Sequence, residues 1–217
     1  RVGATGKSLP GEARLRLHSA RRDIICTRMD SDSAFLDGKL LIAMPGMGDP
    51  RFDRAVIFLC AHSPDGAMGL IVNKPAGDLK VRDLLRQLDI DPGGAPAEAR
   101  VHFGGPVEHG RGFVLHSADY GAEGATLKVS DSFAMTATVD VLQALARGDG
   151  PKRALLALGY SGWGPGQLEG EIQANGWLMA AADPEVVFDA PDGTKWEAAL
   201  KSLNIDPILL SAGGGRA

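Results

Sequence analysis

Cys60 and His62 are the residues of this chain best spaced for nucleophilic chemistry. Both lie in the segment 54–62 (RAVIFLCAH), which is typical of a strand, and residues i and i+2 of a strand point to the same face. An imidazolium beside a thiol favours the nucleophilic thiolate. No third group that would orient the imidazole is identifiable. The alternative is a buried thiol near a strand end and a histidine that enters solvent at Ser63-Pro64.

Other catalytic and metal-binding motifs are incomplete in this sequence, because a required residue is missing or the spacing does not occur. The segment 3–8 (GATGKS) lacks the first glycine of a phosphate-binding loop, because Arg1 stands there. Ser161 has the setting of a nucleophile elbow, but the position two residues later, which needs a small side chain, holds Trp163. No metal or cofactor is expected, because no HxxxH or CxxC spacing occurs among the scattered histidines His62, His102, His109 and His116.

The strongest candidate for a binding site is the segment 158–177 (LGYSGWGPGQLEGEIQANGW). It holds six glycines beside two tryptophans, and so many permissive positions are costly in chain entropy. Gln167, Glu171 and Asn175 follow at i, i+4 and i+8, so one helix face would present amide and carboxylate groups to a ligand. The alternative is the solvated side of an amphipathic helix whose apolar residues are buried.

Two further loops are expected to border the same site. Gly104-Gly105-Pro106 can bring backbone close to a ligand, and Asn73-Lys74 presents two donors ahead of Pro75. The alternative is that each loop is an ordinary turn without a binding role. If the prediction is right, these segments converge on one concave surface. The predicted ligand-binding residues are Asn73, Lys74, Gly104, Gly105, Pro106, Gly162, Trp163, Gly164, Gln167, Glu171 and Asn175.

The elements that must position these residues are hairpin-like strands with helices interspersed. Strands are expected at 39–44, 54–62, 67–72, 100–103, 112–117, 127–129, 133–136, 154–159 and 177–181. Helices are expected from an Asp78 cap to Leu88, from Thr138 or Asp140 to Gly148, from Pro165 to Gly176, and over 194–203. The irregular alternation favours an α+β fold over a doubly wound parallel sheet. We expect a single compact domain over 29–212, without internal repeats.

Charge is distributed unevenly along the 217 residues. Residues 1–28 hold seven basic and two acidic residues, a net charge of +5, whereas the rest holds 16 basic against 25 acidic residues, a net charge of −9. An acidic body argues against direct DNA binding, because DNA affinity is largely electrostatic. The basic head resembles a targeting segment in its composition. It is expected to be disordered and translated from upstream of a natural start at Met29, and the alternative is a segment that binds polyanions. The tail 213–217 is also expected to be disordered.

Compartment and membrane association follow from cysteines and hydropathy. Cys26 and Cys60 are the only cysteines, too few for a disulfide framework, so a cytosolic, reducing compartment is expected. No apolar run approaches the ~20 residues that cross a bilayer. The hydrophobic fraction of 44% and charged fraction of 23% are ordinary for a globular protein.

Four long motifs resemble the YqgE/AlgH family of bacterial proteins. They cover residues 40–75, 101–117, 157–178 and 195–206, and include LLIAMPGMGDPRF, VHFGGPVEHG, GYSGWGPGQLEGEI and KWEAALKSLNID. The resemblance implies an α+β domain with a branched, mixed or antiparallel sheet, partly barrel-like and surrounded by helices. Members are labelled transcriptional regulators, and no enzymatic activity is established for them. This chain departs from the family at Ala61, often Glu, and at Ser161, often Ala, which argues against catalysis by either cluster.

The leading hypothesis is therefore a non-catalytic cytosolic regulatory or adaptor protein that binds a small ligand or a protein partner. The alternative is a thiol-dependent or hydrolytic enzyme that uses Cys60 and His62. It requires an accessible thiol with the imidazole within hydrogen-bond reach.

Overall fold

The computed structural model describes residues 35–95 and 98–210. The chain divides into two units, Arg1–Ser33 and Ala34–Ala217, and every described residue lies in the second. The expectations for residues 1–28 and 213–217 lie outside the described residues.

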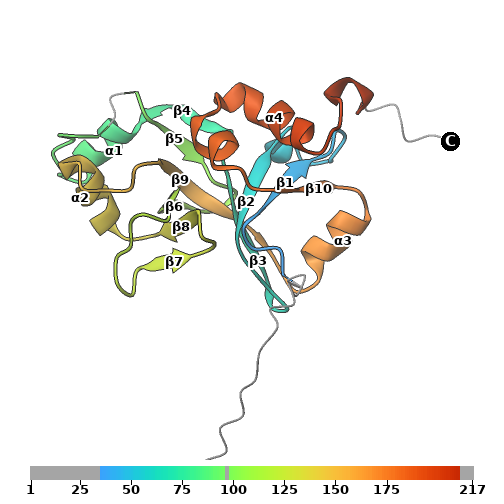
Figure 1. Cartoon of the computed structure of the whole chain (residues 1–217), viewed down its shortest axis with the longest axis horizontal. Coiled ribbons are helices and arrows are strands. Elements are labelled where there is room, and N and C mark those ends of the chain that lie inside the picture. The colour runs from blue at the N-terminus through green and yellow to red at the C-terminus, as the bar shows by residue number, and fades with distance from the viewer. Residues whose placement is uncertain (1–34, 96–97, 211–217) are drawn as a thin grey trace, which may run out of the picture. The chain divides into compact units, whose positions relative to one another are not determined.

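Ten strands in the described residues form one curled sheet (Figure 1). Its main path runs β10-β1-β2-β3-β9-β6-β8-β7, while β5 pairs with both β9 and β4. Only β5 and β9 run parallel, so the predicted α+β class with a branched, largely antiparallel sheet is confirmed. The strands are β1 (Lys39–Ala43), β2 (Val56–Ser63), β3 (Gly66–Ile71), β4 (Pro75–Lys80), β5 (Arg100–Phe103), β6 (Val107–Ser117), β7 (Thr126–Lys128), β8 (Phe133–Thr136), β9 (Ala154–Trp163) and β10 (Trp177–Ala181).

Strand β9 is the branch point of the sheet. In its first half, Leu158 lies opposite both Phe103 of β5 and Gly112 of β6. In its second half, Ser161 lies opposite Gly69 of β3. The strand therefore leaves one part of the sheet and joins the other, and its last residues reach the site described below.

The helices cover different parts of this sheet (Figure 1). Helices α1 (Val81–Gln87) and α2 (Val139–Arg147) lie together at the left of the view, α4 (Lys195–Ser202) lies above β1 and β2, and α3 (Gln167–Gln173) lies at the right. Short helical turns include η1 (Pro50–Phe52), η2 (Glu185–Asp189), η3 (Asp192–Thr194) and η4 (Pro207–Leu209). None of the helices in the described part of the chain has the length and apolarity to span a bilayer.

The central strands are buried on both faces, which explains their continuous apolar runs. Leu40 and Phe58 pack with Trp196 and Leu200 of α4 on one face. On the other face, a second cluster joins strand residues to α3, and it comprises Leu41, Ile57, Leu59, Trp163, Leu168 and Trp177 among others. The end of β9 and the start of β10 thus contribute their indoles to the face that carries α3.

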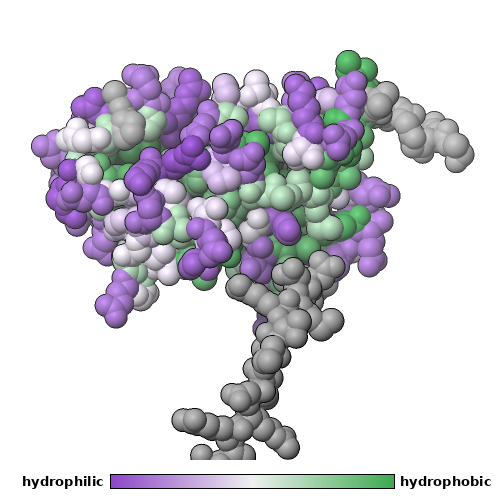
Figure 2. Space-filling view, in the orientation of Figure 1, coloured by the Kyte–Doolittle hydropathy of each residue, from purple (hydrophilic) through white to green (hydrophobic). Residues whose placement is uncertain are grey.

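Large exposed apolar side chains of the described surface include Leu88 and Val139, which line a second cavity of about 210 Å³ at α1 and α2. Ile208 in η4 is 83% exposed, and Figure 2 shows a green patch over that turn at the upper right. In the same view, purple, hydrophilic residues are mixed with white and green ones over the region of α1 and α2. Isolated exposed apolar residues are ordinary for a folded domain.

Two sequence-based expectations about local structure are wrong. Asp78 does not cap α1, because β4 continues to Lys80 and the helix begins at Val81 without a side-chain cap bond. The strand expected to end at Gly159 continues to Trp163 as the second half of β9. Gly159 has φ +71, and a Cβ there would lie 2.6 Å from the carbonyl oxygen of Gly105. This glycine permits a close crossing of backbones rather than ending the strand.

Candidate functional site

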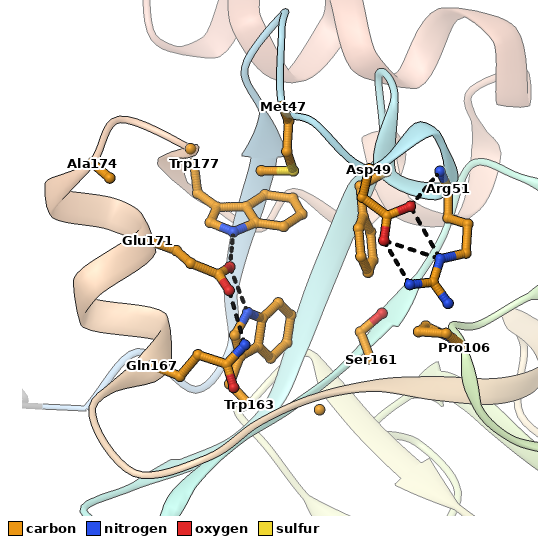
Figure 3. Close-up of a pocket in the computed structure, with 13 residues that line it drawn as sticks. Met47, Asp49, Arg51, Pro106, Ser161, Trp163, Gln167, Glu171, Ala174 and Trp177 are labelled. Carbon is orange, nitrogen blue, oxygen red and sulfur yellow. Dashed lines mark hydrogen bonds and ion pairs between the residues drawn. The ribbon is translucent and has the colours of Figure 1, made fainter.

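A cavity of about 380 Å³ lies where the end of β9, α3, the start of β10 and η1 meet (Figure 3). Five predicted residues line it, namely Pro106, Gly162, Trp163, Gln167 and Glu171. The volume is within the usual range of small-molecule sites. Segments far apart in the chain therefore converge on one concavity, although Pro106 is the only residue of the two predicted bordering loops that lines it.

Glu171 organises the aromatic wall of the cavity. Its Oε2 accepts hydrogen bonds from the indole nitrogens of Trp163 at 2.9 Å and Trp177 at 2.8 Å. Its Oε1 accepts a 3.0 Å hydrogen bond from the amide of Gln167, one helical turn away. The two indoles meet edge to face with their centroids 6.0 Å apart. One carboxylate thus fixes both tryptophans, because three donors satisfy it.

An ion pair from η1 forms the opposite wall (Figure 3). Arg51 Nε lies 3.0 Å from each carboxylate oxygen of Asp49, and its Nη2 lies 2.6 Å from Oδ2. Asp49 also caps the turn by accepting a 2.9 Å hydrogen bond from the backbone N of Arg51. The side-chain hydrogen bond from Arg51 lowers the pKa of Asp49 from its ordinary value. The carboxylate therefore holds the guanidinium in one orientation.

The cavity is completed by residues of differing polarity. Ser161 is 1% exposed, and its hydroxyl donates to the carbonyl of Gly104 at 3.4 Å. Phe52 packs edge to face against Trp177 at 5.7 Å, and the side chain of Met47 reaches toward the same indole (Figure 3). The site combines a rigid apolar half with a polar half that contains the arginine.

Asn73 and Lys74 do not line the cavity. The Asn73 amide accepts from Val56 N at 2.8 Å and donates to the carbonyl of Arg54 at 2.8 Å, so it holds the entry to β2. The Lys74 ammonium donates a 2.9 Å hydrogen bond to the carbonyl of Arg51 and so stabilises η1. Lys74 thus supports the backbone of Arg51, whereas Asn73 holds the segment between η1 and β2.

The predicted glycines near Pro106 have a packing role in this structure. A Cβ on Gly104 would lie 2.2 Å from the carbonyl oxygen of Gly159, and one on Gly105 would lie 2.2 Å from the backbone carbon of Tyr160. Gly164 lies outside the cavity, and its backbone N donates to the Gln167 side chain at 3.1 Å. Gly104 and Gly105 therefore allow the loop before β6 to pass close to the backbone of β9.

The polar row is shorter than expected. Gln167 and Glu171 share a helix face, but α3 ends at Gln173 and Asn175 adopts the left-handed conformation with φ +58. Asn175 is therefore rotated off that face, and the expectation of a continuous i, i+4, i+8 row is wrong. Asparagine tolerates this conformation and is common where helices end.

The predicted binding residues leave out eight of the thirteen that line the cavity, above all Met47, Asp49, Arg51, Phe52 and Trp177. A local signal existed for η1, since an aspartate directly before a proline is typical of the start of a helical turn. Nothing in that signal places the turn opposite α3, because the contact is long-range.

The thiol and imidazole predicted to be neighbours are separated. The register of β2 against β3 shifts between Leu59 and Ala61, so the strand alternation that would align Cys60 with His62 is interrupted by a bulge. Cys60 is 2% exposed in the cluster beneath α4, and burial raises its pKa to about 12. The interpretation of Cys60 and His62 as a catalytic pair is therefore wrong, and the alternative of a buried thiol agrees with the structure.

His62 is engaged elsewhere. Its Nδ1 accepts a 3.0 Å hydrogen bond from the backbone N of Leu36, which leaves the proton on Nε2 for Glu169 of α3, 2.7 Å away. The imidazole therefore joins β2 to α3, and Cys60 has no base to activate it among these contacts.

Alkylation kinetics test this assignment. In a Cys26→Ser variant, we expect native Cys60 to react with iodoacetamide at pH 8 at least 100-fold more slowly than in 6 M urea, because both its pKa and its burial disfavour attack. Mass spectrometry of timed aliquots gives the rates. Comparable rates in both conditions would restore the thiol as a candidate nucleophile.

The site and fold define a class of protein, an α+β domain with a branched sheet and a preformed cavity walled by paired indoles. The family model described as AlgH-like matches residues 40–208. A UPF0301 protein of Ruegeria pomeroyi is 66% identical over 183 residues, which cover 84% of this chain and 99% of that protein. A UPF0301 protein of a Methylobacterium species is 52% identical over 210 residues, covering 94% of this chain and 100% of the relative.

Solved structures agree with this assignment. The solution structure of the AlgH protein from Pseudomonas aeruginosa is similar with a TM-score of 0.69 and 40% identity, covering 87% of this chain and 100% of that one. A crystal structure of a Corynebacterium diphtheriae protein shares the fold at a TM-score of 0.64 and 22% identity, covering 81% of this chain and 89% of that chain. The chain belongs to the AlgH-like family, and the resemblance expected from the four motifs is confirmed.

Proposed function

We propose that the protein is a non-catalytic regulatory or adaptor protein that binds a small ligand, or a side chain of a protein partner, in the cavity between α3 and η1. The observation that carries this proposal is the Glu171 network. It holds two indoles in fixed positions, which reduces the ordering cost of binding. Rigid aromatic walls with a few oriented polar groups are typical of recognition sites.

The cavity favours binding over catalysis. Ser161 is the only hydroxyl or thiol nucleophile among its lining residues, and that hydroxyl donates to a backbone carbonyl rather than to a base. The carboxylates of Asp49 and Glu171 are occupied by arginine and indole donors. An acid–base or nucleophilic mechanism would need one of these groups to be free.

A cytosolic location and the absence of direct DNA binding are parts of the same proposal. The proposed location depends on cysteine usage, since two cysteines are too few for a disulfide framework. Residues 29–217 carry a net charge of −9, since 16 basic residues face 25 acidic ones. Such a surface repels the phosphate backbone of DNA.

A ligand screen with a blocked cavity tests the proposal. Metabolites and nucleotides are added to the full chain, and a ligand present at 100 times its Kd stabilises the folded state by about 2.7 kcal/mol, roughly 5–10 °C in Tm for a domain of this size. Met47→Trp places a larger side chain in the cavity, so it is expected to abolish the shift.

Met179→Trp is the matched control, because Met179 is 42% exposed on β10 and does not line the cavity. It is expected to retain the full shift. A screen without any stabilising ligand, or a ligand that stabilises the Met47→Trp variant as much as the wild type, would overturn the proposal.

A further inference from the structure

Most of the side-chain hydrogen-bonding groups that remain unused in the cavity walls are N–H donors. An arginine side chain has five N–H groups, and Arg51 directs its Nε–H and one Nη2–H at Asp49. Three N–H groups then remain on a guanidinium that lines the cavity and is 56% exposed. The Gln167 amide uses one of its two N–H groups on Glu171, so a further donor remains there.

The acceptors of the same walls are largely occupied. A carboxylate offers about four lone-pair positions, and Asp49 receives the backbone N, Nε and Nη2 of Arg51 across both oxygens. Glu171 receives three donors, two of them on the same oxygen. A ligand that fits this cavity must therefore supply acceptors more than donors.

The guanidinium and the indoles lie at different ends of the cavity, and the Gln167 amide lies beside the indoles. Figure 3 shows Arg51 beside Ser161 and Pro106, and Glu171 with the two indoles on the opposite side. Met47 points toward Trp177 on the aromatic side. A ligand that spans the cavity would meet a fixed guanidinium at one end and aromatic surface at the other.

We propose that the cavity binds a small acid in which an aromatic or other flat apolar group stands a few bonds from a carboxylate, either as a free molecule or as the C-terminal residue of a peptide. Arg51, held by Asp49, would donate to the carboxylate, and Trp163 and Trp177 would contact the apolar group. The guanidinium fork matches a carboxylate geometrically. This inference depends on the proposed function, since it names the ligand class of the same cavity.

Isosteric probes distinguish this ligand class from others. Binding of 3-phenylpropionate, 3-phenylpropionamide and 3-phenylpropylammonium to the full chain is measured by isothermal titration. The acid is expected to bind at least tenfold more tightly than the amide, because charge-assisted hydrogen bonds are stronger than neutral ones. An amide that binds as tightly as the acid would overturn the inference, and so would preferential binding of the ammonium compound, which would assign the aromatic wall to a cation.

Variants locate the carboxylate. The double variant Asp49→Asn/Arg51→Gln removes both charges of the ion pair, so Asp49 is not left without its partner and Glu171 is unchanged. It is expected to weaken acid binding at least tenfold while leaving the amide unchanged. Arg111→Gln is the control, because Arg111 is exposed, pairs with Glu108 and lies outside the cavity. Loss of acid binding in Arg111→Gln but not in the double variant would contradict the assignment.

The two sources of the carboxylate are separated with a short peptide that ends in phenylalanine and its C-terminal amide. The inference is supported if 3-phenylpropionate binds more tightly than its amide, or if the peptide acid binds more tightly than the peptide amide. The acid with the lower Kd, the free molecule or the peptide, identifies the source of the carboxylate. If no acid binds but a ligand from the screen binds in a manner blocked by Met47→Trp, the carboxylate inference fails and the proposed binding function stands. If neither binds, both fail.

Discussion

Gly105→Ala is expected to destabilise the protein by about 3 kcal/mol or more, among the largest effects of any single methyl group in this fold. A Cβ at this position would lie 2.2 Å from the backbone carbon of Tyr160 and 2.3 Å from the backbone nitrogen of Ser161. Those atoms belong to β9 and cannot rotate away as a side chain can. Gly105 also has φ +154, which L side chains rarely adopt. The free energy of unfolding is measured by urea denaturation.

Gly121→Ala is the matched control. A Cβ at Gly121 meets no atom within 4 Å, and its φ is not positive, so its effect is expected to stay within about 0.5 kcal/mol. Equal stabilities for the two variants would show that β9 can shift away from the Gly105 loop. Because Ser161 and Gly162 line the cavity, such a shift would also alter the site.

The architecture could be predicted because its signals are local. The apolar run before the turn at Ser63 predicts β2 and its hairpin partner β3, and the structure has both. The predicted C-terminus of α2 at Gly148 is confirmed by its left-handed conformation at φ +82. Helix and strand signals depend on neighbours a few residues apart, which a single sequence displays directly.

The α3 side of the site could be predicted from the sequence, but the η1 side could not, because its place in the cavity depends on long-range packing. The segment with Trp163 and Glu171 is recognisable from its composition, whereas Asp49 and Arg51 look like an ordinary capped turn until the fold places η1 opposite α3. The bulge at Cys60 is invisible for the same reason, since a register shift is set by the partner strand.

A buried cluster beside α4 holds the C-terminal part of the fold against the sheet. Lys195 is 2% exposed, and its ammonium donates to the Val72 carbonyl at 2.8 Å and to Asp192 at 3.1 Å. His102 lies 3.0 Å from the same Asp192 oxygen. Burial lowers the pKa of Lys195, and burial alone would raise that of Asp192, but the hydrogen bond and charge of His102, together with Lys195, lower it to about 2.

Lys195→Met is expected to destabilise the protein by about 3 kcal/mol at pH 7, the low end for a broken buried pair because Asp192 is partly exposed. The substitution keeps most of the apolar volume but leaves the Val72 carbonyl without its side-chain donor and Asp192 with His102 as its remaining partner. Lys201→Met on the exposed side of α4 is the control, with an expected effect below about 0.5 kcal/mol. The Asp192→Asn/Lys195→Met double variant is expected to recover part of the loss, since it removes the unpaired charge. Urea denaturation measures all three variants, and equal losses for Lys195→Met and Lys201→Met would contradict the pairing.

The same cluster predicts an acid-dependent stability with a defined sign. The folded-state pKa of Asp192 lies near 2 and its ordinary value is 3.8, so between these values the unfolded chain binds more protons and stability rises with pH. The contribution is fully present above about pH 4 and is lost as the pH falls toward 2. Lys195→Met removes a charge that lowers this pKa, so its stability should fall less steeply from pH 4 to pH 2 than that of the wild type. Parallel slopes for the two proteins over that interval would show that Lys195 does not contribute to the acidity of Asp192, and the cost of the substitution would then come from the Val72 carbonyl alone.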